Sequence, residues 1–327
     1  MYKRFYNLQK NPFEITPDPG FLYATRKHNE ALAALYYGVK GRKGFVVLTG
    51  EVGTGKTVIV RCLLQILNRA NVAFAYVFNP CLSPMEFLQY VAGDFRLPTA
   101  GKSKSELLLE LSQYVISRYQ KGYTTVLVVD EAHHLSTDVL EEVRLLTNLE
   151  TGQAKLLQIL LVGQPELDDK LDSIDLRQLK QRIALRANLG PLDLDETRGY
   201  VYRRMQIAGC SRPAEVFPME TVLELHRQSR GYPRLINTLC ENGLIQGYAR
   251  QTRNIGPQVI EEIAADFRLN VVHPSVLQNR EPGAASEIQR AAQTLLDLYS
   301  RLRSTQRSSS DASMQVAAGA REDEPYI

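Results

Sequence analysis

The stretch Gly50-Glu51-Val52-Gly53-Thr54-Gly55-Lys56-Thr57 fits the pattern G-x-x-x-x-G-K-[ST] and decides the fold of this chain. It follows an apolar run typical of a strand, Phe45 to Leu48, and precedes a helical pattern, Val58 to Leu64. Glycines let the backbone close around phosphates, so that N–H groups and the positive end of the next helix point at the anion. The octet is therefore predicted to bind a nucleotide, with Lys56 reaching the β- and γ-phosphates and the Thr57 hydroxyl binding Mg²⁺.

A pair of carboxylates further along the chain supports this prediction. Thr125 to Val129 is an apolar, β-branched run, which is typical of a strand buried on both faces of a parallel sheet, and it ends in Asp130-Glu131. Ligands of open α/β sheets bind at the carboxyl ends of the strands. We expect Asp130 to be the acid associated with Mg²⁺ and Glu131 to polarise the attacking water as a general base.

Five apolar runs alternate with helical patterns, which predicts an α/β fold: a parallel sheet flanked by helices. The runs are Phe45 to Thr49, Val72 to Phe78, Thr125 to Val129, Leu156 to Val162 and Ile183 to Leu189. After Gly190-Pro191 the patterns are helical, which predicts a small all-helical domain. The expected organisation is a nucleotide-binding core with an N-terminal lead-in (1–190), a helical domain (191–270), and a linker, an amphipathic helix near 285–303 and a disordered tail (271–327).

Composition narrows the function classes. Of the 327 residues, 44% are hydrophobic and 23% charged, which is typical of a globular protein. A net charge of +3 does not by itself indicate a nucleic-acid or membrane partner. The four cysteines are scattered without a C-x-x-C pattern, which argues against zinc and a disulfide framework. Without a signal-peptide pattern or an apolar run of about 18 residues, we expect a cytoplasmic protein that reaches the inner membrane only through a partner.

Together these residues resemble the AAA+ ATPases, a class of P-loop NTPases, and within them the branch of general secretion pathway protein A and its relatives in pilus and exopolysaccharide-export loci. The N-terminal string Phe5-Tyr6-Asn7-Leu8, Asn11-Pro12-Phe13 and Pro17-Asp18-Pro19 is similar to that branch's lead-in to the nucleotide loop. The resemblance implies a helical lid after the core. It also implies that the lead-in wraps over the adenine, with Phe21, Leu22 and Tyr23 as contacts.

Three further residues take expected roles from this resemblance. Gln164, at the end of the fourth strand, matches the sensor 1 position, which orients the lytic water. Arg182 matches the arginine finger that one subunit supplies to its neighbour, with Arg177 as the second choice. Arg234, in Arg230-Gly231-Tyr232-Pro233-Arg234, matches sensor 2, where an arginine opening a lid helix touches the γ-phosphate. The resemblance thus implies a homo-oligomer that uses ATP and Mg²⁺.

The function predicted from these features is an ATPase that drives or regulates assembly of an envelope secretion, pilus or polysaccharide-export machine, with a protein of that machine as its partner. The alternative is a DNA-bound AAA+ regulator resembling transposition ATPases, for which a basic patch around Lys102 and Lys104 would be needed. Nucleic acid is the less favoured partner. A DEAH-type helicase is disfavoured because no second set of strands follows residue 190. His133 and His134 are then expected to cap or pack the next helix.

Overall fold

The computed structural model describes residues 1–14, 16, 18–68, 71–78 and 81–269. Its contacts divide the chain into two units, Met1–Asn279 and Arg280–Ile327, and every described residue belongs to the first. The predicted helix at 285–303 and the tail after it lie outside the described residues.

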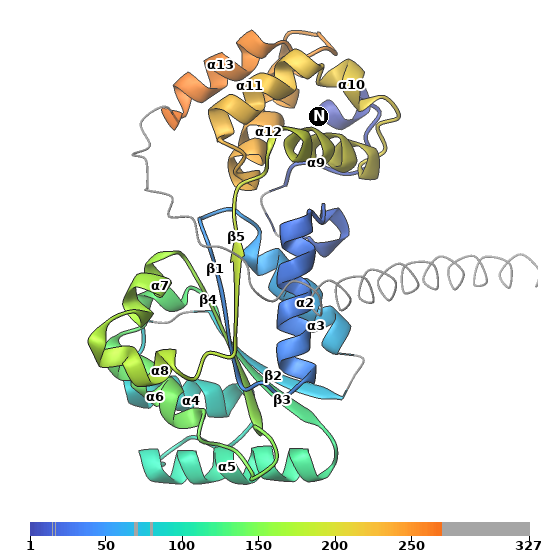
Figure 1. The fold of residues 1–327 in the computed structure, drawn as a ribbon. Helices are drawn as coiled ribbons and strands as arrows, with labels where there is room; N and C mark the ends of the chain where they lie inside the picture. The colour runs from blue at the N-terminus through green and yellow to red at the C-terminus, as the bar shows by residue number, and fades with distance from the viewer. Residues whose placement is uncertain (15, 17, 69–70, 79–80, 270–327) are drawn as a thin grey trace, which may run out of the picture. The chain divides into compact units, whose positions relative to one another are not determined.

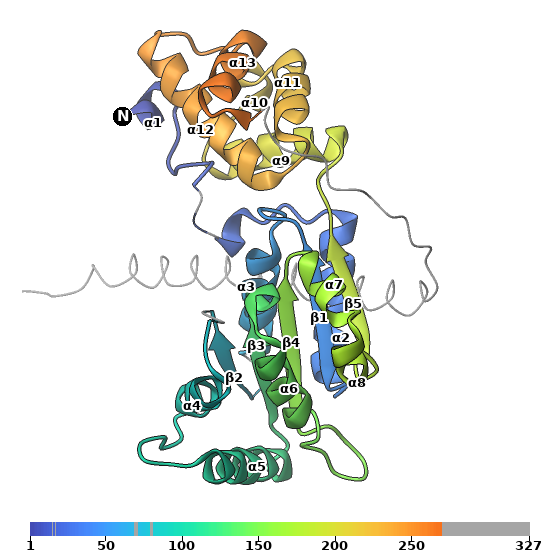
Figure 2. The same ribbon diagram turned by 90° about the vertical axis from the view of Figure 1, so that its left-hand side faces the viewer.

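A parallel five-stranded sheet forms the centre of the part before residue 190 (Figures 1 and 2). Its strands are β1 (Phe45–Gly50), β2 (Val72–Val77), β3 (Thr124–Val129), β4 (Leu157–Gly163) and β5 (Leu185–Leu189). They lie in the order β2-β3-β4-β1-β5, and every neighbouring pair is parallel. The predicted α/β class is confirmed, and all five strands fall on the predicted runs. Because β1 lies beside β4 and β3 lies beside β4, the carboxyl ends of these three strands meet at one edge of the sheet.

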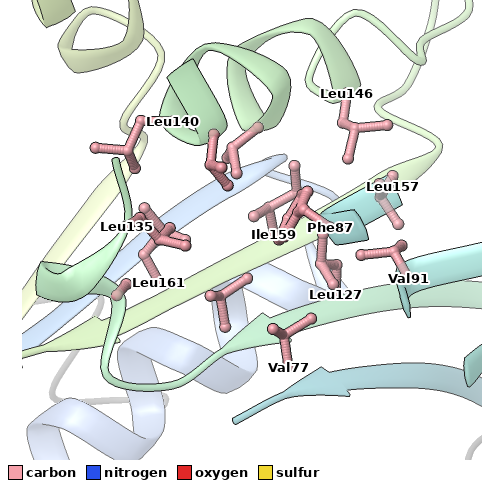
Figure 3. Close-up of a cluster of buried hydrophobic side chains, with 14 of the residues drawn as sticks. Val77, Phe87, Val91, Leu127, Leu135, Leu140, Leu146, Leu157, Ile159 and Leu161 are labelled. Atoms are coloured by element: carbon pink, nitrogen blue, oxygen red, sulfur yellow. The ribbon is translucent and has the colours of Figure 1, made fainter. Parts of the chain in front are cut away.

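Helices cover both faces of the sheet, as Figures 1 and 2 show. They are α2 (Arg26–Lys40), α3 (Lys56–Leu67), α4 (Pro84–Asp94), α5 (Lys104–Gln120), α6 (Thr137–Leu146), α7 (Glu166–Leu171) and α8 (Arg177–Lys180), with short 3₁₀ turns η1 (Pro19–Phe21), η2 (Ala132–His134) and η3 (Ile174–Leu176). Side chains alternate along each strand, so Leu127 and Ile159 pack under α4 and α6 (Figure 3), whereas Val128 and Leu160 pack under α2 and α3. The three central strands β1, β3 and β4 are therefore buried on both faces, which explains their continuous apolar runs, whereas the edge strands β2 and β5 are partly exposed.

Beyond β5 the described chain is helical. It forms α9 (Leu194–Ile207), α10 (Pro213–Val216), α11 (Met219–Ser229), α12 (Pro233–Ala249) and α13 (Pro257–Asp266), which share a second hydrophobic core. The N-terminal segment, with α1 (Tyr2–Phe5), joins that core: the Phe13 ring meets the Phe217 ring at 5.9 Å, and the Tyr2 hydroxyl donates to Glu241 at 2.8 Å. The lead-in, grouped with residues 1–190 from sequence, thus packs with the helices that follow residue 190.

No helix among the described residues combines the length and the apolar character that a membrane crossing requires.

Candidate functional site

The glycine loop lies between the end of β1 and the start of α3. Gly53 and Gly55 have φ angles of +79° and +99°, a region that L-residues with a Cβ rarely adopt. The buried Lys56 ammonium donates to the carbonyl oxygens of Gly50 and Glu51 at 2.7 and 3.1 Å. Burial lowers the pKa of Lys56, and the charges of Glu131, Asp130 and Glu51 oppose that shift. Because burial disfavours the ammonium, an anion beside it would stabilise the charged form.

A histidine below the loop supports its backbone, and sequence reasoning did not find it. His28 is buried near the start of α2, where its Nε2 lies 3.1 Å from the Thr54 carbonyl oxygen and its Nδ1 lies 2.7 Å from the Thr25 hydroxyl. Burial lowers the pKa of His28, which favours the neutral ring. A neutral ring with Nε2–H donating to Thr54 and Nδ1 accepting from Thr25 satisfies both contacts. The signal is invisible in sequence, because 26 residues separate His28 from Thr54.

Asp130 and Thr57 come together from β3 and α3. The Thr57 hydroxyl lies 3.3 Å from Asp130 Oδ2, and the Tyr76 hydroxyl donates to the same oxygen at 2.7 Å. Burial and the neighbouring Asp130 raise the pKa of Tyr76, so the phenol stays a donor. The Thr57 hydroxyl and the Asp130 carboxylate are hard oxygen donors close enough to bind one metal ion. Mg²⁺ is usually bound by one or two protein oxygens together with phosphate oxygens and waters. This donor set therefore fits the predicted metal.

Glu131 and Gln164 lie on either side of His133. Glu131 has a left-handed backbone (φ +52°), and its side chain is 46% exposed. His133 Nδ1 lies 3.6 Å from Glu131 Oε2, and His133 Nε2 lies 2.9 Å from the Gln164 side-chain nitrogen. The prediction that His133 caps the next helix is wrong, since the Ser136 hydroxyl caps α6. The His133 ring lies between the two predicted catalytic side chains.

Arg234 reaches the glycine loop from the helical part. Its backbone N–H donates to the Gly53 carbonyl oxygen at 3.3 Å, and a Cβ on Gly53 would lie 2.4 Å from Arg234 Cβ. Gly231 makes this approach feasible, because its φ is +78° and a Cβ there would lie 2.0 Å from the Leu192 carbonyl oxygen. The glycine in the Arg-Gly-Tyr-Pro-Arg string thus lets α12 begin beside the loop.

A cavity of about 410 Å³ opens over the glycine loop, within the size range of small-molecule sites. Its walls include Val52 to Thr57, Glu131, Arg234 and the predicted adenine contacts Phe21, Leu22 and Tyr23. Sequence reasoning missed two further wall residues on α9: Tyr200 and the buried Arg204, whose guanidinium stacks 4.9 Å from the centre of the Phe21 ring.

The remaining predicted residues stand outside this wall. Gly50 and Glu51 contact Lys56 through their carbonyl oxygens, and Asp130 lies next to the wall residue Thr57. Gln164 contacts His133, which is itself outside the wall.

The two candidates for the arginine finger differ in their surroundings, and neither lines the cavity. Arg182 is partly buried and donates to the Thr147 hydroxyl at 2.8 Å. Arg177, at the start of α8, is exposed. Neither contributes to the cavity wall of its own chain, which is compatible with a finger supplied to a neighbour.

The fold and the loop define a P-loop ATPase of the AAA+ class. Residues 39–171 match the family model described as AAA domain. The chain is 45% identical over 256 residues to General secretion pathway protein A of Aeromonas hydrophila. That alignment covers 78% of this chain and 46% of the relative, so the chain spans less than half of the relative's length. The chain is therefore an AAA+ ATPase related to general secretion pathway protein A.

Solved structures share the fold. The Aeropyrum pernix ORC2 protein, in its ADPNP–ADP complexes, has a TM-score of 0.60 at 15% identity, with 81% of this chain and 75% of that chain covered. Cdc6p from Pyrobaculum aerophilum has a TM-score of 0.57 at 17% identity, covering 76% and 70%. Identities this low show the arrangement of helices and strands and carry no function to this chain.

Proposed function

We propose that this protein binds ATP with Mg²⁺ at the glycine loop, hydrolyses it in a homo-oligomer, and uses the cycle to drive or regulate assembly of an envelope secretion, pilus or polysaccharide-export machine. The observation that carries the enzymatic part is the convergence of Lys56, Thr57, Glu131 and Arg234 on one cavity. The relationship to General secretion pathway protein A supports the cellular process.

In this proposal the triphosphate lies along the loop, between backbone N–H groups and the start of α3. Lys56 exchanges its contacts with the loop carbonyl oxygens for the β- and γ-phosphates, which restores the charge that burial disfavours. Glu131 removes a proton from the attacking water. Its side chain is 46% exposed, so water can reach the carboxylate. Arg234, at the loop-facing start of α12, neutralises charge on the γ-phosphate.

Thr57 and Asp130 would hold the Mg²⁺ ion, with the Tyr76 hydroxyl fixing the orientation of the carboxylate. When bound, the ion supplies positive charge that stabilises the transferring phosphoryl group.

Two substitutions test the enzymatic part. Lys56→Ala should abolish ATP binding measured by calorimetry, because it removes the cation that faces the triphosphate. Glu131→Gln should bind ATP with unchanged affinity and lose about 10²–10⁴-fold in turnover, because the general base is gone. Equal nucleotide affinity for Lys56→Ala and wild type, or undiminished turnover in Glu131→Gln, contradicts the assignment of that residue.

The alternative of a DNA-bound regulator depended on a basic patch around Lys102 and Lys104. In the structure Lys102 pairs with Glu110 and Lys104 pairs with Glu142, so both cations are neutralised by neighbouring carboxylates. This supports the preference for a protein partner. A DNA-binding titration with ATP at several salt concentrations separates the two functions, since phosphate contacts give a steep dependence on salt and a protein-directed ATPase gives no binding to measure.

A further inference from the structure

The buried imidazole of His28 holds one peptide of the glycine loop through a hydrogen bond whose direction is determined. Its Nε2 lies 3.1 Å from the Thr54 carbonyl oxygen, and a carbonyl oxygen can only accept, so Nε2 carries the hydrogen. Burial lowers the pKa of His28, which keeps the ring neutral near pH 7 and leaves a lone pair on Nδ1. The Thr25 hydroxyl, 2.7 Å from Nδ1, donates to that lone pair. One arrangement of hydrogens therefore satisfies both ring nitrogens.

The rest of Thr54 is held by the loop itself. Thr54 is fully buried, and its N–H and its hydroxyl both donate to the Glu51 carbonyl oxygen, at 3.3 and 2.8 Å. The His28 ring also packs closely on the next residue, since a Cβ on Gly55 would lie 3.2 Å from Nε2. Thr54 is therefore fixed from two sides, by the loop at its N–H and side chain and by α2 at its carbonyl group.

The peptide between Thr54 and Gly55 turns this contact into a direction for a donor. A trans peptide is planar, and its C=O and N–H groups point to opposite sides. Because the Thr54 C=O points at His28, the Gly55 N–H points away from the ring. Gly55 is the N-cap of α3, so its N–H has no partner within the helix. It also lines the cavity, and a glycine contributes only backbone to a wall.

The contact of His28 differs from that of Lys56, which a nucleotide must displace. Lys56 donates to the carbonyl oxygens of Gly50 and Glu51, and in the proposed function it leaves them for the phosphates. The Thr54 carbonyl oxygen carries a partial negative charge and does not bind an anion, so a phosphate has no reason to displace His28 from it. A donor that is oriented before its ligand arrives loses little freedom on binding.

We propose that His28 is a positioning residue of the phosphate site, which aims the Gly55 N–H at the nucleotide phosphates by holding the Thr54 carbonyl oxygen on the opposite side of the peptide. Backbone N–H groups directed in this way bind phosphate oxygens at the start of a helix. The inference rests on the proposed function, since it assigns His28 a part in nucleotide binding at the same loop.

The experiment compares His28→Leu with His28→Gln in the full chain. Leucine removes both ring nitrogens, whereas glutamine keeps an N–H donor for Thr54 and an oxygen that accepts from Thr25. His28→Leu should raise the Kd for ADP, measured by calorimetry, about 10–100-fold, which is the contribution of one hydrogen bond to a charged group. The KM for ATP should rise by the same factor while kcat at saturating ATP stays near that of wild type, because the Gly55 N–H binds the phosphates equally before and during the reaction. His28→Gln should recover part of the affinity.

His226→Leu is the matched control for lost stability. The His226 Nδ1 also lies beside a threonine hydroxyl, that of Thr197 at 2.9 Å, and His226 does not line the cavity. Its replacement should leave the Kd for ADP unchanged even where it lowers the Tm.

The proposal is overturned by a wild-type Kd in His28→Leu, by a fall in kcat without a rise in KM, or by a loss of affinity that His28→Gln does not reduce. If His28→Leu does not fold, Thr25→Val and Thr25→Ser test the same chain of hydrogen bonds. Valine removes the donor that fixes the Nε2–H tautomer and should weaken ADP binding, whereas serine keeps it; equal affinities for the two variants overturn the proposal. Unchanged ATP affinity in Lys56→Ala would refute nucleotide binding at the loop, whereas lost affinity in Lys56→Ala beside full affinity in His28→Leu refutes the positioning role alone.

Discussion

Replacing Gly231 by alanine should test whether the close approach of this glycine to Leu192 holds the start of α12 beside the glycine loop. Gly231 has a φ of +78°, and a Cβ there would lie 2.0 Å from the carbonyl oxygen and 3.0 Å from the carbonyl carbon of Leu192. These are backbone atoms, so no side chain can move away to make room. The Leu192 N–H also donates to the Gly231 carbonyl oxygen at 2.9 Å, which holds the two segments together.

The size of the effect follows from two terms. A left-handed backbone costs an alanine roughly 1–2 kcal/mol, offset by about 0.4–1 kcal/mol from the smaller entropy of the unfolded chain. Forcing extra atoms into a packed site adds about 1–3 kcal/mol. Gly122 supplies a matched control, because its φ is +76° and a Cβ there would meet nothing within 4 Å. Gly122→Ala should therefore show the first term alone, and Gly231→Ala should show both.

The assay is thermal unfolding of the wild type and both variants, followed by calorimetric titration with nucleotide. At about 2–4 °C per kcal/mol for a unit of this size, Gly231→Ala should lower the Tm several degrees more than Gly122→Ala. It should also weaken ATP binding, because Leu192 and Arg234 both line the cavity. A Tm for Gly231→Ala equal to that of Gly122→Ala would refute the argument from close approach.

Three further outcomes are expected. Arg182→Ala should bind ATP normally and hydrolyse it about 10³–10⁵-fold more slowly, and mixing it with Lys56→Ala should restore partial activity. No recovery in demonstrably mixed oligomers would contradict a finger at Arg182 and favour Arg177 or a monomeric enzyme. Burial in the folded state lowers the pKa of His28, so the unfolded chain binds a proton at this imidazole more readily. The neutral ring therefore contributes its whole stabilisation above about pH 6.5, and the free energy of unfolding falls as the pH is lowered below that value. The Tm of His28→Gln should therefore vary less between pH 7 and 5, and an unchanged slope would contradict this. Tyr76→Phe should raise the Mg²⁺ concentration needed for activity about tenfold without changing metal-free ATP binding, since the partner that orients Asp130 is lost; an unchanged Mg²⁺ titration would count against that role.

The sheet could be predicted from sequence because its signals are local. A strand buried on both faces must be apolar throughout, so β1, β3 and β4 are legible as uninterrupted runs. The glycine loop is legible for a similar reason, since positive φ angles at Gly53 and Gly55 need that residue type.

Contacts between distant segments could not be predicted in the same way. His28 supports Thr54 and His133 bridges Glu131 and Gln164, yet each stands in sequence as a histidine among helical residues with no spacing rule to mark it. Whether a basic patch exists around Lys102 also could not be read from sequence, because Lys102 pairs with Glu110, eight residues further along the chain. Such features become visible when side chains are placed in space.

The course of the N-terminal segment gives a physical reason to expect nucleotide binding to be linked to the position of the helical part. Phe13 is fully buried in the helical core, Phe21 lines the cavity and stacks under Arg204 of α9, and His28 holds the glycine loop. A ligand that contacts Phe21 therefore acts on a segment anchored at one end in the helical core and at the other end below the loop. Breaking the packing of Phe13 or the buried hydrogen bond of His28 would cost free energy. A displacement of Phe21 is therefore expected to move the helical part and the glycine loop together. An ATPase that performs work on a partner needs this kind of connection between the phosphate site and a second body of the protein.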